Sequence, residues 1–249
     1  MRPGEDRVAV VTGAGSGIGR AAAVALAAAG WRVAIAGRRR EPLEETSALA
    51  NDALVVPTDV ADRESVGELF SQARSELGRI DFLFNNAGVT GPAVQLDEVS
   101  VEEWTEVIDI NLSGSFYCAQ EAFRAMREQS PQGGRIVNNG SVSAIVPRPH
   151  AVSYATAKHA ITGLTKSIAL EGRQYEIACG QIDIGNAVTE MSEAWVAEAL
   201  QPDGSVKAEA LMAAGDVADA IVYMAGLPLE ANVLNLTVMA TQMPLVGRG

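Results

Sequence analysis

Three residues in one short segment could carry out acid–base chemistry together. In "GSVSAIVPRPHAVSYATAK", residues 140–158, Tyr154 and Lys158 are four residues apart and Ser141 lies thirteen residues before the tyrosine. Residues four apart on a helix lie on one face, about one turn from each other, so the ammonium could act on the phenol. The alternative is a half-buried aromatic beside a solvated amine, with a turn-forming serine upstream.

The charge of Lys158 determines what the phenol could do. An ammonium roughly 5 Å from the phenol, at an effective dielectric constant of about 20, favours the phenolate by about 3 kcal/mol. We therefore expect the pKa of Tyr154 to fall from about 10 toward about 8, which suits a general acid or base near neutral pH. Ser141 follows the apolar run "GRIVNNG". Its hydroxyl would lie at the C-terminal end of that strand, where it could orient a carbonyl group.

A glycine-rich turn near the start of the chain could bind a phosphate. "VAVVTGAGSGIGRAAAVALAAAG", residues 8–30, runs from an apolar strand through Gly13, Gly17 and Gly19 into an alanine-rich helix. Glycine lets the backbone turn tightly and approach a pyrophosphate, and a helix N-terminus offers unpaired N–H groups to an anion. Glycines that only pack a strand-to-helix turn are the alternative. The position directly after the first strand favours the phosphate site.

The second apolar strand ends in a run of arginines, "VAIAGRRR", residues 33–40. Gly37 stands at the strand tip, where an acidic residue would hydrogen-bond the ribose hydroxyls of NAD. Arginine there accommodates the 2′-phosphate of NADP through bidentate, charge-assisted bonds. The sequence therefore favours NADP(H) over NAD(H), with Arg38 as the leading contact and Arg39 as a further candidate. A solvated basic helix start would account for one or two of the three arginines.

Composition limits the partners and the compartment. The formal net charge of -12 and the pI of about 4.6 would repel nucleic acid and acidic membrane surfaces. No apolar run reaches the roughly 18 residues of a membrane span, and the start lacks the apolar core of a signal peptide. Cys118 and Cys179 form no CxxC pair, and His150 and His159 have no metal-ligand spacing. We expect a reduced, cytoplasmic protein without a metal site.

Short apolar runs alternate with helical spacing along the whole chain, which predicts an α/β fold. Such alternation indicates a doubly wound parallel sheet with helices on both faces, formed here by one domain over residues 1–249. The seven expected strands lie within residues 7–13, 32–37, 53–60, 80–88, 134–141, 176–183 and 232–239. Residues 186–214 interrupt this rhythm and predict a lid over the substrate, with an extra surface helix pair as the alternative.

These motifs together resemble the short-chain dehydrogenase/reductase family in its common form of about this length. "TGAGSGIG", "TDV", "NNAG", "NLSGSF", "GSVS", "YATAK" and "IGNAVT" follow one another in the family's order and spacing. The resemblance implies a Rossmann-type sheet of seven strands and hydride transfer between nicotinamide and a ketone or secondary alcohol. Tyr154 would then exchange a proton with the substrate oxygen, and Ser141 would hydrogen-bond that oxygen. Lys158 would bind the nicotinamide ribose and lower the pKa of the tyrosine, while Asn111 would support a proton relay through water.

The same resemblance implies a longer set of cofactor contacts. Asp59 and Val60 would touch the adenine, Asn86 would lie along the cofactor, and Thr189 would reach the nicotinamide carboxamide. The full predicted set is Gly13, Ser16, Gly17, Ile18, Gly19, Arg38, Arg39, Asp59, Val60, Asn86, Ala87, Gly88, Tyr154, Lys158 and Thr189.

Some positions depart from the family pattern. Ile184-Gly185 stands where Pro-Gly is usual, Gly140 replaces a common serine, and the ending "TVMATQMPLVGRG" lacks the usual Asp-Gly-Gly. Mostly apolar candidate walls suggest a hydrophobic or mid-sized carbonyl substrate. Arg148 or His150 could hold a substrate carboxylate, although an arginine between two prolines is more often a solvated loop residue. The candidate walls are Ser143, Ile145, Val146, Pro147, Arg148, His150, Met191, Trp195 and Leu200.

Two further questions concern assembly and activity. In the family, the helices corresponding to 102–128 and 152–171 commonly pair across subunits, which implies a homotetramer or homodimer. Burial of these helices within one chain is the alternative. A sensor or scaffold that binds NADP without turnover, and a lyase or epimerase that uses the cofactor internally, are the rival functions. The complete set of proton-handling residues favours the oxidoreductase over a sensor.

Overall fold

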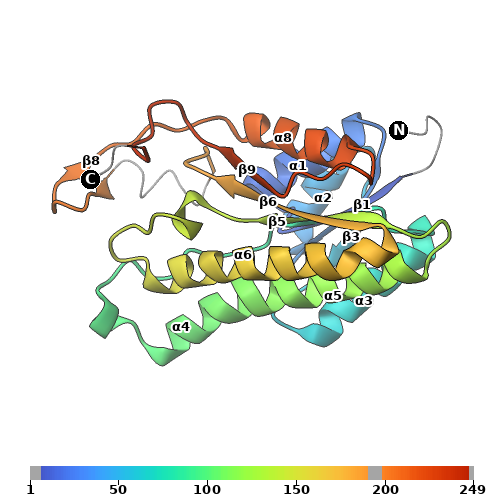
Figure 1. Ribbon diagram of the computed structural model, residues 1–249, viewed down its shortest axis with the longest axis horizontal. Coiled ribbons are helices and arrows are strands. Elements are labelled where there is room, and N and C mark those ends of the chain that lie inside the picture. Colours follow the sequence, from blue (N-terminus) through green and yellow to red (C-terminus); the bar gives the residue numbers. More distant parts are fainter. Residues whose placement is uncertain (1–6, 190–197, 247–249) are drawn as a thin grey trace.

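A parallel sheet of seven strands forms the centre of the computed structural model, which describes residues 7–189 and 198–246 (Figure 1). The strands follow the order β3-β2-β1-β4-β5-β6-β9 across the sheet. They are β1 (Val8–Thr12), β2 (Arg32–Gly37), β3 (Leu54–Pro57), β4 (Phe82–Asn85), β5 (Gly134–Asn139), β6 (Ile177–Ile184) and β9 (Asn235–Val238). The predicted Rossmann-type, doubly wound α/β fold is confirmed. Six of the seven expected segments contain one strand each, and β6 runs one residue beyond the expected segment 176–183.

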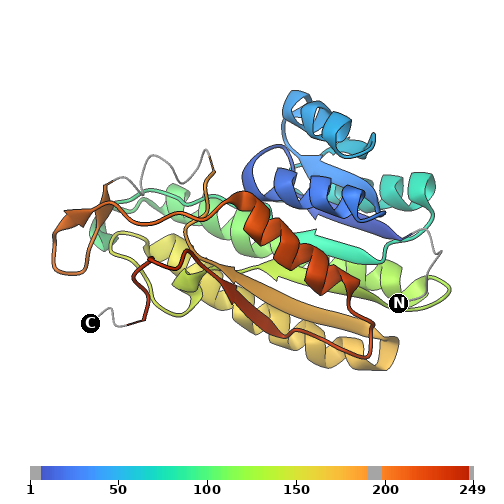
Figure 2. The same ribbon diagram turned by 90° about the horizontal axis from the view of Figure 1, so that it is seen from above.

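Helices cover both faces of the sheet, which explains why its strands are apolar almost without interruption (Figures 1 and 2). One core lies between the sheet and α1, α2 and α8, and the other lies between the sheet and α3, α5 and α6. The α-helices are α1 (Gly17–Ala28), α2 (Arg40–Leu49), α3 (Arg63–Leu77), α4 (Val101–Ile108), α5 (Gly114–Glu128), α6 (Val152–Glu171) and α8 (Ala214–Gly226). Short 3₁₀ turns are η1 (Leu96–Glu98), η3 (Val142–Ala144) and η4 (Gly172–Tyr175).

The chain reverses its direction of travel across the sheet at β1. This strand pairs with β2 on one side and with β4 on the other. Strands β2 and β3 follow one another toward one edge of the sheet, and β4, β5, β6 and β9 follow one another toward the opposite edge. The two halves diverge beyond the carboxyl ends of β1 and β4, where open α/β sheets hold their ligands. The topology thus places the glycine-rich turn after β1 at the centre of this edge.

The predicted helix 102–128 is two helices separated by a π-helical turn. Residues Asp109–Ser113 form this turn, η2, between α4 and α5. Single π turns inside helices often occur at functional sites, and here the turn contains Asn111. The expectation of one uninterrupted helix was therefore wrong at this point.

The described part of the 186–214 segment forms a small hairpin beside the sheet. Strands β7 (Ala199–Leu200) and β8 (Val206–Lys207) pair antiparallel, and a bridge joins Ala187 to Met212. Within 186–189 and 198–213 there is a hairpin rather than a helix pair. The candidate walls Met191 and Trp195 lie outside the described residues.

Within residues 7–189 and 198–246, no helix is long and apolar enough to cross a membrane, and no cluster of His, Cys, Asp or Glu is arranged to hold a metal ion. Cys118 and Cys179 are both free and buried. The cytoplasmic location and the assignment of the whole chain to one domain stay predictions.

Candidate active site

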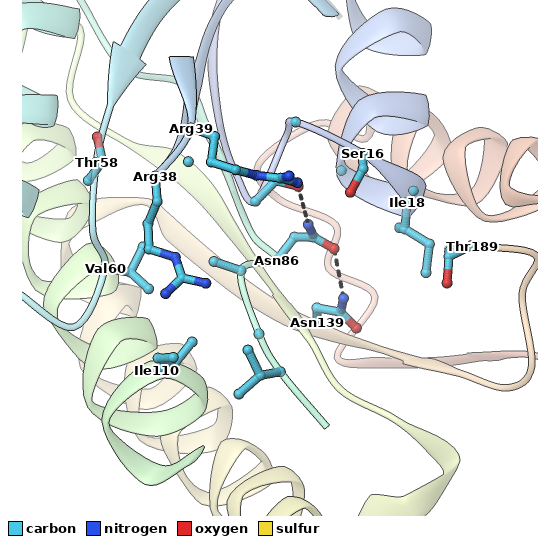
Figure 3. Close-up of a pocket in the computed structure, with 18 of the residues that line it drawn as sticks. Ser16, Ile18, Arg38, Arg39, Thr58, Val60, Asn86, Ile110, Asn139 and Thr189 are labelled. Carbon is cyan, nitrogen blue, oxygen red and sulfur yellow. Dashed lines mark hydrogen bonds between the residues drawn. The ribbon is translucent and has the colours of Figure 1, made fainter. Parts of the chain in front are cut away.

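A cleft of about 350 Å³ runs along the carboxyl edge of the sheet (Figure 3). Every residue of the predicted cofactor set lines this cleft, whereas the two other predicted catalytic residues, Asn111 and Ser141, do not. The sequence patterns missed some of the lining residues, most of which are neighbours of predicted ones. These are Gly15, Gly37, Pro42, Thr58, Val89, Ile110 and Asn139.

The glycines of the glycine-rich turn are needed for packing, and they also form one wall of the cleft. A Cβ on Gly19 would lie 2.2 Å from the Gly13 carbonyl oxygen, so this glycine is required by packing alone. Gly17 has a φ of +51°, which favours glycine, and begins α1 at the cleft wall. Helix α1 has no side-chain N-cap bond and no acidic residue in its first turn. Its first N–H groups therefore suit a bound anion, as a dinucleotide pyrophosphate would be.

A chain of hydrogen bonds joins the glycine turn to the reacting lysine. The Thr12 hydroxyl accepts from the backbone N–H groups of Asn86 and Ala87, at 2.9 and 3.0 Å. Asn139 donates its side-chain amide to Asn86 Oδ1 at 2.8 Å, a bond that is drawn in Figure 3. Lys158 Nζ in turn donates to the Asn139 carbonyl at 2.7 Å. Asn139 thus connects the two ends of the cleft, and its place at the end of an apolar strand was the only signal of this.

The three arginines after β2 divide into two groups. Arg38 and Arg39 are exposed and extend from the strand end over the cleft (Figure 3). Among the described residues, no carboxylate forms an ion pair with either of them. Arg40 begins α2 and lies 3.6 Å from Glu44 on the helix surface, outside the cleft lining. Two guanidinium groups are thus available to an anion, and the third arginine is the solvated helix start.

The structure brings Tyr154, Lys158 and Ser141 together where this cleft ends. Tyr154 and Lys158 lie one turn apart on α6, with Lys158 Nζ 5.5 Å from the centre of the tyrosine ring. Ser141 caps η3 after β5, and its Oγ accepts from the Ser143 N–H at 3.1 Å. A hydrogen bond with Ser141 acts on the phenol of Tyr154. The segment is therefore a convergence of functional groups rather than a surface helix with a distant serine.

The pKa of Tyr154 differs in direction from the expectation. Burial raises this pKa above its ordinary value, although the Ser141 hydrogen bond and the positive charge of Arg148 lower it; the nearby Asp183 raises it further. Burial also lowers the pKa of Lys158 to about 8, against the opposing effect of Asp183. The predicted fall toward 8 was wrong because desolvation of the phenolate is the largest contribution to this pKa, and the positive charge that lowers it is that of Arg148 rather than that of Lys158.

The side chain of Asn111 is held by the loop after β4 and does not line the cofactor cleft. Its side chain accepts from the Val89 N–H and donates to the Val89 carbonyl, both at 2.8 Å. It is 1% exposed. This amide fixes the loop after β4 against the π turn, and the proton-relay role stays a prediction.

A second cavity of about 400 Å³ adjoins the cofactor cleft and shares Tyr154 with it. Ser141 also lines this second cavity. Of the predicted substrate walls, Ser143, Arg148, His150 and Leu200 line it, whereas Ile145 and Val146 do not. Ile145 is 61% exposed, and Pro147 lines a neighbouring pocket.

Arg148 is not the solvated loop residue that its position between two prolines suggested, and a role toward a substrate carboxylate stays a prediction. Its guanidinium forms a bidentate ion pair with Glu209, at 2.9 and 2.5 Å, and also donates to Asn186 Oδ1 at 3.1 Å. The side chains of Arg148 and Glu209 are only 13% and 2% exposed. Burial raises the pKa of Glu209, but hydrogen bonds from Arg148, Gln201 and Asn186 outweigh burial and lower this pKa to about 2. Arg148 is thus a buried partner of the hairpin segment, which the sequence spacing did not indicate.

Comparison with known proteins places this arrangement in a family. The family model for short chain dehydrogenase matches residues 7–200. The chain belongs to the short-chain dehydrogenase family. An uncharacterised oxidoreductase of Staphylococcus aureus (strain USA300) is 34% identical to this short-chain dehydrogenase over 235 residues, 94% of this chain and 96% of the relative. The family membership that the sequence motifs predicted is confirmed.

Two solved structures resemble this short-chain dehydrogenase closely in fold. A 3-ketoacyl-(acyl-carrier-protein) reductase from Brucella melitensis, complexed with NADH, has a TM-score of 0.84 and 26% identity, covering 94% of this chain and 97% of its own. An alcohol dehydrogenase from Thermococcus sibiricus, complexed with 5-hydroxy-NADP, has a TM-score of 0.80 and 26% identity, covering 94% and 96%. One neighbour thus holds an NAD cofactor and the other an NADP derivative, so fold likeness does not choose between the two.

Proposed function

We propose that this protein is an NADP(H)-dependent oxidoreductase that interconverts a ketone and a secondary alcohol. The observation that carries the proposal is the position of Tyr154, which lines both the cofactor cleft and the adjoining cavity. A group that transfers a proton in a hydride-transfer reaction must reach the substrate oxygen beside the nicotinamide. Ser141 and Lys158 both lie close to Tyr154, which supports the roles that the family resemblance implies for them.

The cleft residues fit a nicotinamide dinucleotide. The uncapped N-terminus of α1 suits the pyrophosphate, and the exposed Arg38 and Arg39 suit a 2′-phosphate. Asp59 and Val60 would hold the adenine, and Lys158 and Thr189 would hold the nicotinamide end. When bound, such a cofactor supplies or accepts the hydride.

The residues around the substrate oxygen favour reduction of a ketone near neutral pH. Ser141 Oγ accepts a bond from the Ser143 N–H, so the remaining proton of the hydroxyl is available for donation. That proton acts on the phenol of Tyr154, and a bound substrate oxygen would receive it instead. The raised pKa of Tyr154 keeps the phenol protonated, as a general acid must be. Lys158, with a pKa of about 8, is largely protonated at pH 7 and stabilises negative charge that develops on the phenol oxygen.

The experiment measures loss of NADPH absorbance with a panel of neutral ketones, in parallel with NADH. We expect turnover with NADPH and a kcat/KM at least about tenfold higher than with NADH, equivalent to about 1.4 kcal/mol of transition-state binding. Tight NADPH binding without oxidation by any ketone would favour the sensor or scaffold. A preference for NADH would leave the oxidoreductase in place and remove the role of Arg38.

We also propose that the protein forms a homodimer or homotetramer through α5 and α6. Part of α6 already packs inside the chain, since Ala157 and Ile161 are buried. The other side is open: Gly163 has no neighbour within 4 Å of a Cβ, and Leu170 is 61% exposed. Phe116 on α5 is 44% exposed. Light scattering coupled to size exclusion would give the mass of the assembly, and a mass of one chain would overturn the proposal.

A further inference from the structure

A buried carboxylate lies directly behind the serine of the reacting site. Asp183, on β6, is 1% exposed. Its Oδ1 accepts from the backbone N–H of Ser141 at 3.0 Å and from Gln181 Nε2 at 2.6 Å. Its Oδ2 accepts from Asn235 Nδ2 at 2.7 Å. A carboxylate is costly to bury unless it is paired or hydrogen-bonded, and here both oxygens have donors.

Asp183 also explains the glycine before the serine. A Cβ on Gly140 would lie 2.1 Å from Asp183 Oδ1 and 2.7 Å from Gln181 Nε2, so any side chain at position 140 would collide with this group. Gly140 is one of the positions where the chain departs from the family pattern, which commonly has serine. The glycine at position 140 and the aspartate at position 183 are therefore linked, because the Asp183 carboxylate occupies the space that a serine side chain at position 140 would need.

The charge of Asp183 acts on both reacting groups of α6. It raises the pKa of Lys158 and also that of Tyr154. Among the residues that the structure describes, the other charge that acts on Tyr154 is Arg148, which is paired with Glu209. The titratable groups that line the substrate cavity besides these are His150 and Glu198. Asp183 is thus the negative group that acts on the two reacting side chains from the sheet side.

We propose that Asp183 is a positioning residue of the reacting site: it holds the backbone of Ser141 so that the hydroxyl faces the substrate oxygen, and it stabilises the ammonium of Lys158. Gly140 makes room for it. The proposal rests on the proposed function, because a positioned donor and a charged lysine matter only if Tyr154 transfers a proton. Asp183 touches neither cavity, so its effect is exerted through Ser141, Lys158 and Tyr154.

The main test is Asp183→Asn, which keeps the shape and removes the charge. The exposed Asn235 can turn its amide to accept from the new amide, so the fold should be retained. Without the negative charge, the pKa values of Tyr154 and Lys158 both fall. Ketone reduction needs the protonated phenol and the ammonium, so the alkaline limb of the kcat profile should move to lower pH by about one unit. We also expect kcat to fall about tenfold, with an unchanged dissociation constant for NADPH.

The matched control is Asp219→Asn, an exposed aspartate on α8, which should leave the profile unchanged. A variant Asp183→Asn with the wild-type profile would overturn the proposal. A lower kcat with an unmoved profile would also overturn it, because a purely structural role predicts that result.

Two measurements separate this proposal from the proposed function. If the wild-type protein oxidises no NADPH, the proposed function fails, and phenolate absorbance during a pH titration then decides the role of Asp183. Subtraction of the Tyr154→Phe spectrum isolates the Tyr154 transition, which Asp183→Asn should move to lower pH; an unmoved transition overturns the proposal.

A double-mutant cycle of stability tests whether a side chain at position 140 and Asp183 compete for the same space. Gly140→Ser should lower the melting temperature by several degrees, and Asp183→Ala should recover part of that loss. Additive effects would contradict the shared space.

Discussion

The nucleotide half and the reacting half of the cleft are built in different ways. The nucleotide half presents backbone N–H groups and exposed side chains from two neighbouring turns, with Arg38 and Arg39 open to solvent. The reacting half depends on buried charges that come from separate segments: Lys158 on α6, Asp183 on β6, and the Arg148–Glu209 pair. Exposed charges are available to a ligand and contribute little to folding, whereas buried charges couple activity to stability and to pH.

The largest effect expected from this comparison is on turnover. Tyr154→Phe removes the proton donor but keeps the ring, so kcat/KM for a ketone should fall by about 10³-fold, within the range that general acids contribute. The dissociation constant of NADPH should change by less than about twofold, because the nucleotide half is untouched. Steady-state kinetics and fluorescence titration measure the two quantities. Tyr223→Phe, at an exposed tyrosine of α8, is the control. Similar rates for Tyr154→Phe and the wild type would remove the tyrosine from the mechanism.

The difference between the halves also explains what the sequence could predict. The glycine turn, Arg38 and the Tyr154–Lys158 pair are each encoded within a few consecutive residues, so local motifs, taken together with the family resemblance, singled them out. Asp183 and Glu209 gain their roles from partners in distant segments: Ser141 lies on another strand end, and Arg148 lies in another loop. Hydrophobic periodicity and motif spacing describe only neighbouring residues, so they could not predict these contacts between distant segments.

The pKa of Tyr154 could not be predicted from the sequence for a related reason. The spacing to Lys158 supplied the charge but not the degree of burial, which depends on the whole fold. Likewise, the sequence placed Arg148 in a loop between two prolines, where solvation is common. Only the position of Glu209 in the hairpin segment shows why the guanidinium is buried.

The second expected effect is on stability in acid. The pKa of Glu209 in the folded protein is about 2, below its ordinary value of 4.5. A lowered pKa stabilises the fold above the ordinary value, and this contribution, on the order of 3 kcal/mol, is lost as the pH falls from about 5 toward 2. Glu209→Gln should therefore be less stable than the wild type at pH 7, and its stability should depend less on pH below 5. Urea unfolding at several pH values measures the difference.

An exposed ion pair provides the control for Glu209. Glu44→Gln removes the partner of Arg40, in a pair whose side chains are 62% and 58% exposed. Such pairs contribute about 0.5 kcal/mol or less, so the free energy of unfolding should stay close to that of the wild type. If the free energy of unfolding at pH 7 falls by the same amount in both variants, the buried Arg148–Glu209 pair stabilises the fold no more than the exposed pair does. The proposed difference between buried and exposed charges would then be wrong.

The smallest expected effect is on cofactor choice in the nucleotide half. Arg38→Ala should raise the KM for NADPH by more than about tenfold, or about 1.4 kcal/mol, and leave the KM for NADH nearly unchanged, because only NADPH carries the 2′-phosphate. Arg40→Ala is the matched control, since Arg40 pairs with Glu44 outside the cleft. Because Arg38 is exposed, salt should screen its attraction, so the KM for NADPH should rise between 0.05 and 0.5 M NaCl more in the wild type than in Arg38→Ala. Equal KM changes in Arg38→Ala and Arg40→Ala would show that the arginines act only through their overall charge, without a specific phosphate contact.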